Sequence, residues 1–308
     1  MREAAMNFKF GVVPIVGRPN VGKSSLLNNI LAYKVSIVSE KPQTTRNAIH
    51  GIYNEPEMQI VFTDTPGIHR PRHKLGEALV KAAVRSLENA DLILYVVEVD
   101  DISISPEDDR IIEILQEVST PIFLVVNKID QVQQSERRLM AVASLFKEKL
   151  PIVGALGVSA KKGYNIDKLV QILKDKLPAG FPWYDEEILT DRPERFLARE
   201  IIREKVLLLT HEEVPHSVAV EVEEYKSPDE YPERDVLYIR ANLVVEREGQ
   251  KTILIGKKGS KIKKIGSLAR SDIETMTGHR VFLDLWIKVR PAWRKSEGEL
   301  WRMGYIER

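Results

Sequence analysis

Short apolar runs alternate with amphipathic stretches over the first half of the chain. The apolar runs have the length of buried strands and lie at Val12–Val16, Ile60–Thr63, Leu92–Val97, Ile122–Val126 and Gly154–Val158. The stretches between them show the apolar spacing of helices: Lys23–Leu31, Lys74–Asn89, Pro106–Glu117, Ser135–Glu148 and Ile166–Leu177. This alternation predicts an α/β domain with a mostly parallel sheet and helices on both faces. We expect Ala48–Tyr53 to add an edge strand, antiparallel to Gln59–Thr63.

The pattern changes at Leu177–Asp185, where two prolines and a glycine break any helix. We therefore expect a first domain at 1–178, a linker at 179–192 and a second domain at 193–308. The predicted elements of the second domain are a helix at Pro193–Leu209, strands at Ser217–Tyr225 and Val236–Val245, a short helix, a helix at Ser260–Met276 and a strand at Val281–Val289. The order α-β-β-α-α-β indicates an α+β domain.

Composition excludes several classes of protein and of chemical site. The 46 lysines and arginines balance 45 aspartates and glutamates, a net charge of +1, which excludes a uniformly basic packaging protein. The chain has no cysteine, so disulfides, thiolate metal sites and cysteine nucleophiles are excluded. Glu3 and Lys9 interrupt the apolar character of the N-terminus, and no apolar run approaches the roughly 20 residues of a spanning helix. We expect a cytoplasmic protein.

A phosphate-binding loop follows the first predicted strand. The pattern G-x-x-x-x-G-K-S is matched by Gly17, Arg18, Pro19, Asn20, Val21, Gly22, Lys23 and Ser24, with Ser25 next in the helix. Glycines let backbone N–H groups converge on a polyphosphate, and the helix N-terminus adds a favourable dipole. Lys23 would reach the β- and γ-phosphates, and the Ser24 hydroxyl would bind Mg²⁺. The alternative is a chance glycine turn with an exposed lysine. The position of the loop between a predicted strand and a predicted helix disfavours it.

Two further motifs lie at strand ends. Asp64-Thr-Pro-Gly67 follows Ile60–Thr63, so the Asp64 carboxylate could hold Mg²⁺ through water and the Gly67 N–H could contact a γ-phosphate. Asn127-Lys128-Ile129-Asp130 follows Ile122–Val126. A carboxylate acceptor at Asp130 suits guanine, whose N1–H and exocyclic amine are adjacent donors, and it disfavours an ATPase. Ser159-Ala160-Lys161 follows the last strand and supplies the remaining loop beside the base, through the Ala160 N–H.

Together these motifs resemble the P-loop GTPases of the translation-factor-related class. The resemblance implies a switch threonine in Gln43-Thr44-Thr45-Arg46. Thr45 is our choice for the Mg²⁺ ligand, together with Ser24 and Asp64, and Thr44 is the alternative. A turn or helix-capping threonine is the structural alternative for either residue. Lys23, Thr45 and Gly67 would then act on the γ-phosphate and form the catalytic group.

The catalytic glutamine of Ras-type GTPases is missing. That glutamine directly follows D-x-x-G, and here the position is Ile68, which cannot orient water. The hypothesis is slow intrinsic hydrolysis, with the attacking water positioned by backbone groups or by a partner. Asn20 matches an asparagine that helps to hold a monovalent cation in several relatives of this subclass. A K⁺ ion there could supply positive charge in place of an arginine finger.

The second domain carries a G-x-x-G loop in a basic stretch. Six lysines and no acidic residue surround it: Lys251, Lys257, Lys258, Lys261, Lys263 and Lys264. A solvated helix start would also be lysine-rich, but the glycine pair and the element order together resemble a KH domain of the bacterial type II topology. The resemblance implies that single-stranded RNA is bound by Ile255, Gly256, Lys257, Lys258, Gly259, Lys261, Ile262 and Lys264. We expect core positions for Ile239, Leu243, Ile265 and Leu268, and packing rather than base stacking for Trp286, Trp293 and Trp301.

A P-loop GTPase followed by one type II KH domain resembles the Era family of bacterial ribosome-assembly GTPases, as does the late Val289-Arg-Pro-Ala-Trp293. The resemblance implies GTP or GDP with Mg²⁺ as cofactors and 16S rRNA near its 3′ end, on the 30S subunit, as the partner. We expect a monomer and leave peripheral contact with the inner membrane face as a second location. A tandem-GTPase ribosome factor is excluded because there is no second phosphate loop. The leading hypothesis is a GTP-hydrolysing switch whose nucleotide state controls RNA binding by the second domain. The alternative function is RNA binding with GTP or GDP as a structural ligand and no significant turnover.

Overall fold

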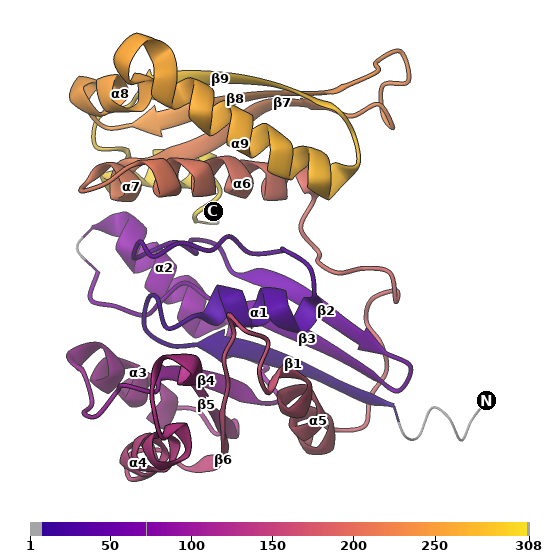
Figure 1. Ribbon diagram of the computed structural model, residues 1–308, viewed down its shortest axis with the longest axis vertical. Coiled ribbons are helices and arrows are strands. Elements are labelled where there is room, and N and C mark those ends of the chain that lie inside the picture. The colour runs from indigo at the N-terminus through magenta and orange to yellow at the C-terminus, as the bar shows by residue number, and fades with distance from the viewer. Residues whose placement is uncertain (1–7, 72, 307–308) are drawn as a thin grey trace. The chain divides into compact units, whose positions relative to one another are not determined.

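The computed structural model describes residues 8–71 and 73–306 (Figure 1). The chain forms two compact units. The first comprises residues up to Ser36, Thr45–Arg72 and Gly76–Asp191, and the second comprises Arg192–Arg308 with two short segments, Ile37–Thr44 and His73–Leu75. Residues 37–44, which precede the expected switch threonine, therefore pack with the second half of the chain.

The first unit is built on a six-stranded sheet of order β2-β3-β1-β4-β5-β6. The strands are β1 (Lys9–Val16), β2 (Ile49–Glu55), β3 (Met58–Asp64), β4 (Ile93–Glu98), β5 (Ile122–Asn127) and β6 (Ile152–Gly157). All neighbours are parallel except β2 and β3. The predicted antiparallel edge strand is thus confirmed. Every residue of β5 is buried, as expected of a central parallel strand covered on both faces.

Helices cover both faces of this sheet. They are α1 (Lys23–Leu31), α2 (Lys74–Arg85), α3 (Pro106–Gln116), α4 (Ser135–Lys147) and α5 (Ile166–Lys176), with a short 3₁₀ turn η2 (Ile129–Gln131). Buried residues of α2, α3 and α4, among them Ala83, Ile111 and Phe146, share one core with β1, β4 and β5. Helices α1 and α5 contact each other on the other face (Figure 1). Parallel strands place the loops after β1, β3 and β5 at one edge of the sheet, where the motifs lie.

The second unit has a three-stranded sheet of order β7-β8-β9 with helices packed against it (Figure 1). The strands are β7 (Ala219–Lys226), β8 (Leu237–Val245) and β9 (Val281–Val289), and the helices are α6 (Glu194–Leu209), α7 (Val214–Ser217), α8 (Glu248–Ile255), α9 (Ser260–Thr277) and α10 (Glu297–Arg302), with 3₁₀ turns η3 (Lys257–Gly259) and η4 (Trp293–Lys295). β7 pairs antiparallel and β9 parallel with β8. The element order α-β-β-α-α-β is confirmed, with the short helices α7 and α10 added to it.

The core of the second unit corrects two expectations. Ile239, Leu243 and Ile265 are fully buried as predicted, but Leu268 is 36% exposed because it lies on the outer side of α9. Trp293 packs as predicted: it is 0% exposed, and its Nε1–H donates to the Ser217 carbonyl at 2.8 Å. The packing expectation is wrong for Trp286 and Trp301, which are 55% and 46% exposed.

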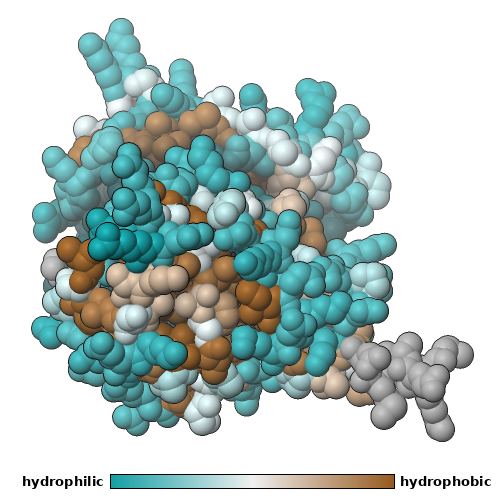
Figure 2. Space-filling view, turned by 60° about the horizontal axis from the view of Figure 1, so that its bottom comes forward, coloured by the Kyte–Doolittle hydropathy of each residue, from teal (hydrophilic) through white to brown (hydrophobic). Residues whose placement is uncertain are grey.

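Hydrophilic side chains cover much of the face that Figure 2 shows. On the face that Figure 2 shows, hydrophobic side chains gather in separate groups between hydrophilic ones. Within residues 8–71 and 73–306, no helix has the length and hydropathy that crossing a membrane requires.

Candidate functional site

The G-x-x-x-x-G-K-S loop joins β1 to α1 in the first unit. Gly22 has φ 100°, a left-handed conformation, and a Cβ added there would lie 2.2 Å from Asn127 Nδ2. Only glycine fits this position without displacing Asn127. The loop therefore brings backbone N–H groups to the start of α1, the geometry that receives a phosphate.

Lys23 is buried at the base of this loop. Its Nζ donates to the carbonyl oxygens of Gly17 at 2.9 Å and Arg18 at 2.7 Å. Burial lowers the pKa of Lys23 from 10.5 to about 8, although the Asp64 carboxylate partly opposes this effect. A bound polyphosphate would favour the charged ammonium and raise this pKa again.

We therefore expect nucleotide binding to take up a proton at Lys23 above pH 8. The free protein loses the Lys23 proton near this pH, and the complex retains it, so affinity falls as pH rises, by up to ~10-fold per pH unit. Calorimetric titration of GDP in buffers of different ionisation enthalpy measures the proton uptake. Lys23→Arg is the control because arginine stays charged. Titration of the nucleotide itself affects both proteins equally and cancels in the comparison. An equal pH dependence in both would contradict this assignment.

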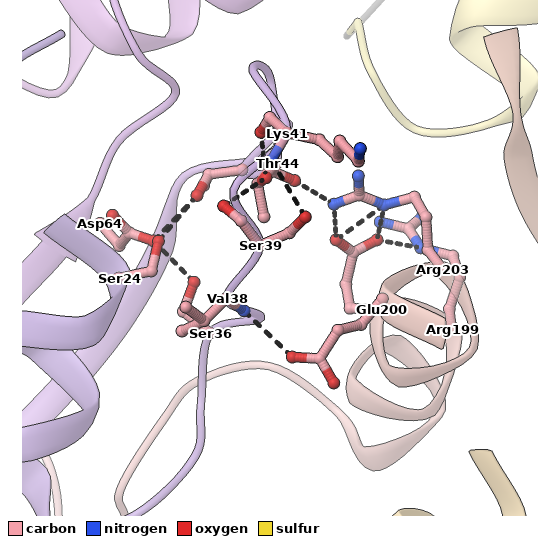
Figure 3. Close-up of polar contacts among 12 residues, drawn as sticks. Ser24, Ser36, Val38, Ser39, Lys41, Thr44, Asp64, Arg199, Glu200 and Arg203 are labelled. Atoms are coloured by element: carbon pink, nitrogen blue, oxygen red, sulfur yellow. Dashed lines mark hydrogen bonds and ion pairs between the residues drawn. The ribbon is translucent and has the colours of Figure 1, made fainter. Parts of the chain in front are cut away.

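The three residues expected at Mg²⁺ meet around one carboxylate oxygen. Figure 3 labels two of them, Ser24 and Asp64. Asp64 Oδ2 accepts hydrogen bonds from Ser24 Oγ at 2.7 Å and Thr45 Oγ1 at 3.1 Å, and the two hydroxyl oxygens lie 3.0 Å apart. Asp64 is 0% exposed, and its Oδ1 is buried without a hydrogen-bond partner in the described part of the chain. Burial raises the pKa of this carboxyl group, and the hydroxyl donors only partly offset the effect. Hydroxyl and carboxylate oxygens around an unsatisfied anion fit a hard cation such as Mg²⁺.

No group of three or more His, Cys, Asp or Glu side chains that could hold a metal occurs among the described residues. Mg²⁺ at nucleotide sites is usually held by one or two carboxylates, waters and substrate phosphates rather than by a cage of carboxylates.

Ser36 is a site residue that the sequence did not reveal. Its Oγ donates to Asp64 Oδ2 at 2.6 Å, and the Asn28 side chain holds its backbone through the Ser36 N–H at 2.9 Å and the Ser36 carbonyl at 2.7 Å. Ser36 lies in an irregular segment after α1 with no motif around it. It fixes the Asp64 carboxylate independently of Ser24 and Thr45.

Thr44 and Thr45 have different surroundings. The Thr45 hydroxyl faces Asp64, whereas Thr44 Oγ1 donates to the Lys41 carbonyl at 2.5 Å, away from that carboxylate. The geometry thus favours Thr45 over Thr44 as the residue beside Ser24.

The loops expected beside the base are joined by Asn127. Its Nδ2 donates to the Val21 carbonyl at 2.8 Å, and its Oδ1 accepts from the Ala160 N–H at 2.9 Å. Asn127 therefore connects the phosphate loop to the Ser159–Lys161 loop. It also accepts the hydrogen bond of the Ala160 N–H, which the sequence had suggested as a donor to the base. Asp130 is exposed, and Ser159 Oγ donates to its Oδ1 at 2.6 Å, which orients the carboxylate. The Lys128 ammonium pairs with Glu98.

The side chain of Arg18, within the phosphate loop, is engaged by two carboxylates. The Arg18 guanidinium pairs with Asp101 at 2.5 Å and Asp108 at 3.0 Å, so Arg18 would meet a nucleotide through its backbone. Asn20, the expected K⁺ ligand, has φ 67°. Gly67 approaches the same loop closely, because an added Cβ would lie 2.8 Å from the Pro19 nitrogen.

Ile68 is 0% exposed and packs in the core with Val16 and Tyr95. A side chain at this position points into the protein, not toward a nucleotide. We expect Ile68→Gln to leave GTP hydrolysis unaccelerated and to lower the free energy of unfolding by about 2–3 kcal/mol, because it buries an amide without partners. Urea denaturation and single-turnover hydrolysis test this, with Ile68→Leu as the volume-conserving control. A stable, faster Ile68→Gln protein would contradict the burial argument.

The G-x-x-G loop of the second unit joins α8 to α9 through η3. Gly256 has φ 70° and ψ 175°, a conformation that essentially only glycine adopts, and a Cβ added there would lie 2.7 Å from the Lys261 Cβ. Lys258 is held at φ 52°, which turns the chain sharply between the two glycines. The loop thus exposes backbone and lysines together.

A groove of about 400 Å³ runs beside this loop between α9 and β9. Ile262, Gly266 and Arg270 line it from α9, and Phe282 and Leu283 line it from β9. Of the two isoleucines expected to bind RNA, Ile262 lines the groove, whereas Ile255, 37% exposed, is not among the lining residues. Arg270 and Phe282 were not predicted from the sequence, because residues from two distant elements form the groove.

Comparison with known proteins gives the family. Residues 12–128 match the family described as 50S ribosome-binding GTPase, and residues 213–294 match the KH domain family. GTPase Era of Clostridioides difficile is 46% identical over 306 residues, which cover 98% of this chain and all of that protein. The chain belongs to the Era family of GTPases.

Solved Era structures agree with this membership. Crystal structures of Era with MgGDPNP and nucleotides 1506–1542 of 16S ribosomal RNA, and of an Aquifex aeolicus Era variant with GDP·AlF4⁻, each superpose with a TM-score of 0.92 at 42% identity. Each covers 97% of this chain and 100% of the solved one. The predicted P-loop GTPase domain and KH domain are confirmed, and the chain is a GTPase of the Era type that binds guanine nucleotides.

Proposed function

We propose that this Era-family protein is a GTP-hydrolysing switch that binds 16S rRNA near its 3′ end and acts in assembly of the 30S subunit in the cytoplasm. The proposal rests on the hydrogen bonds that join Ser24, Thr45 and Asp64 beside the phosphate loop. The same chain carries a KH domain. The solved Era complex with MgGDPNP and 16S rRNA supports the same ligands here. The domains are 1–178 and 193–308, joined by the linker 179–192, in a monomer.

Each part of the nucleotide has assigned residues in this proposal. The loop Gly17–Ser25 holds the phosphates, and Asp130 accepts from guanine while Lys128 and the 159–161 loop flank the base. Ser24, Thr45 and Asp64 would hold Mg²⁺, which would supply positive charge beside the phosphates. The Lys23 ammonium exchanges its two carbonyl partners for phosphate oxygens.

Hydrolysis then depends on groups other than the side chain after D-x-x-G. Ile68 is buried, so backbone groups or a partner position the water, and the intrinsic rate is slow. Asn20 would help to hold K⁺, which would supply positive charge beside the phosphates. The Gly67 N–H contacts the γ-phosphate and loses that contact on hydrolysis, which is the switch event.

RNA is held by the second domain. The backbone at Gly256 and Gly259 approaches the sugar–phosphate chain, and Lys257, Lys258, Lys261 and Lys264 supply the salt-sensitive part of the affinity. Bases enter the groove between α9 and β9, where Ile262 and Phe282 offer apolar and aromatic surfaces. Ile255 lies at the edge of the loop.

A second candidate function is RNA binding with the nucleotide as a structural ligand, which the burial of Ile68 favours. Single-turnover hydrolysis of GTP, measured with and without the RNA 3′ segment and in K⁺ and Na⁺ buffers, separates the two. We expect slow hydrolysis that is faster with RNA and faster in K⁺. No hydrolysis under any of these conditions would support the second candidate, and equal rates in K⁺ and Na⁺ would remove the K⁺ assignment.

A further inference from the structure

Helix α6 holds the segment 37–44 with a buried arginine (Figure 3). Arg203 is 0% exposed, and its Nη2 donates to the backbone carbonyl of Thr44, a residue 159 positions earlier in the chain. This carbonyl belongs to the peptide bond between Thr44 and Thr45.

Glu200, one turn earlier on α6, fixes the guanidinium. Its carboxylate accepts from Arg203 Nε, at 3.3 Å to Oε1 and 3.2 Å to Oε2, and from Nη2. Glu200 is 2% exposed. Burial disfavours the charge on Arg203, but the Glu200 carboxylate outweighs that effect and raises the pKa of Arg203 above its ordinary value. The arginine is therefore charged and held in one orientation.

A second tie joins the same helix to the start of the segment. Glu204 Oε1 accepts from the Val38 N–H at 3.1 Å, and Glu204 is itself fixed by the Lys205 ammonium at 2.8 Å. Residues 200, 203 and 204 share one face of a helix. The segment is thus held near both of its ends by side chains of α6.

The contact with Thr44 acts on the orientation of Thr45. A peptide unit is planar, so fixing the direction of the Thr44 carbonyl also fixes the Thr45 N–H and the position of its Cα. From that position the Thr45 hydroxyl lies 3.0 Å from Ser24 Oγ and 3.1 Å from Asp64 Oδ2.

We propose that Arg203 is a positioning residue for Thr45, which it places at the Mg²⁺ site through the Thr44–Thr45 peptide. The proposal rests on the assignment of Thr45 as a Mg²⁺ ligand above.

Removal of Arg203 is expected to weaken the use of Mg²⁺ in hydrolysis and to leave binding of the guanine base unchanged. Without Arg203 the Thr45 hydroxyl is in place for a smaller fraction of the time, so a higher Mg²⁺ concentration is needed for hydrolysis. Binding of the guanine base by Asp130 does not involve this peptide and stays unchanged.

The test uses the full chain and two ways of removing the arginine. Arg203→Met alone takes from the buried Glu200 carboxylate the nearer of two arginine partners, the other being Arg199 at 3.3 Å, and risks unfolding. Glu200→Leu with Arg203→Met removes both members of the buried pair together and is better tolerated. Arg203→Lys keeps the charge but offers one point donor instead of a planar fork. Arg195→Met is the matched control, since Arg195 also lies on α6 and donates to a backbone carbonyl, that of Val222.

We expect the double variant to need ~10-fold more Mg²⁺ for half-maximal single-turnover hydrolysis, with GDP affinity in the absence of Mg²⁺ unchanged. Arg203→Lys should fall between the double variant and the wild type, and Arg195→Met should match the wild type. A folded double variant with wild-type Mg²⁺ dependence would overturn the role of Arg203. Wild-type protein that hydrolyses GTP without regard to Mg²⁺ would instead refute the assignment of the Mg²⁺ ligands.

Discussion

Asp130→Asn is expected to weaken binding of GTP and GDP ~100- to 1,000-fold and to create affinity for xanthine nucleotides. The Asp130 carboxylate accepts from two adjacent donors of guanine, and an amide replaces one acceptor with a donor, which leaves the base mismatched. Xanthine has a carbonyl where guanine has its amine, so an Asn amide can donate to it. Fluorescence competition with GDP and XDP measures both effects.

The substitution is nearly isosteric and keeps an oxygen for the Ser159 hydroxyl, which donates to Asp130 at 2.6 Å. Loss of fold is therefore not the expected cause of weaker binding. Asp175→Asn is the control, because Asp175 is an exposed carboxylate on α5 in the same unit. An Asp130→Asn protein that retains its preference for GDP over XDP would contradict the role of Asp130 in base selection.

Gly256→Asp should reduce RNA affinity ~10- to 100-fold while GDP binding stays intact. Any side chain at Gly256 is strained at φ 70° and approaches Lys261 to 2.7 Å, and the carboxylate adds a negative charge where phosphates are expected. Filter binding with the 3′ segment of 16S rRNA measures the loss.

Gly249→Asp separates the added charge from the loop geometry. Gly249 lies on α8 of the same unit, is exposed, and has no heavy atom within 4 Å of an added Cβ, so it adds the same charge without distortion. We expect its RNA affinity to be near that of the wild type. Lys257→Gln and Lys258→Gln alter only charge, and each should reduce the slope of log affinity against log salt by ~0.7. Equal losses for Gly249→Asp and Gly256→Asp would indicate that only charge matters at this loop.

The sequence was most informative where local chemistry dictates spacing. The phosphate loop, Asp64-Thr-Pro-Gly67 and Asn127–Asp130 each follow an apolar run, and the parallel sheet brings such strand ends to one edge. Their positions in the fold were predictable because the motif and the strand before it are contiguous. The strand order β2-β3-β1-β4-β5-β6 was not predicted, because pairing between distant strands leaves no local pattern.

Contacts between distant residues were not visible in the sequence. Ser36 reaches Asp64 from an irregular segment, and Arg203 reaches Thr44 from another part of the chain, with no spacing rule for either. The exposure of Leu268 was mispredicted because apolar spacing on α9 does not reveal which side its neighbours cover. The motif Asn127–Asp130 was recognisable in the sequence, but the hydrogen bonds of the Asn127 amide to Val21 and Ala160 were not, because they depend on three loops meeting.

We expect control of RNA binding by the nucleotide state. Its most direct test is crosslinking of the full chain to the 3′ segment of 16S rRNA, with GDP or a non-hydrolysable GTP analogue bound. The variant is Thr45→Ala, which lacks the hydroxyl assigned to Mg²⁺ and therefore cannot respond to the γ-phosphate. We predict that the wild type crosslinks to different extents in the two states and that Thr45→Ala removes the difference. Equal crosslinking of the wild type with GDP and with the GTP analogue would contradict the account.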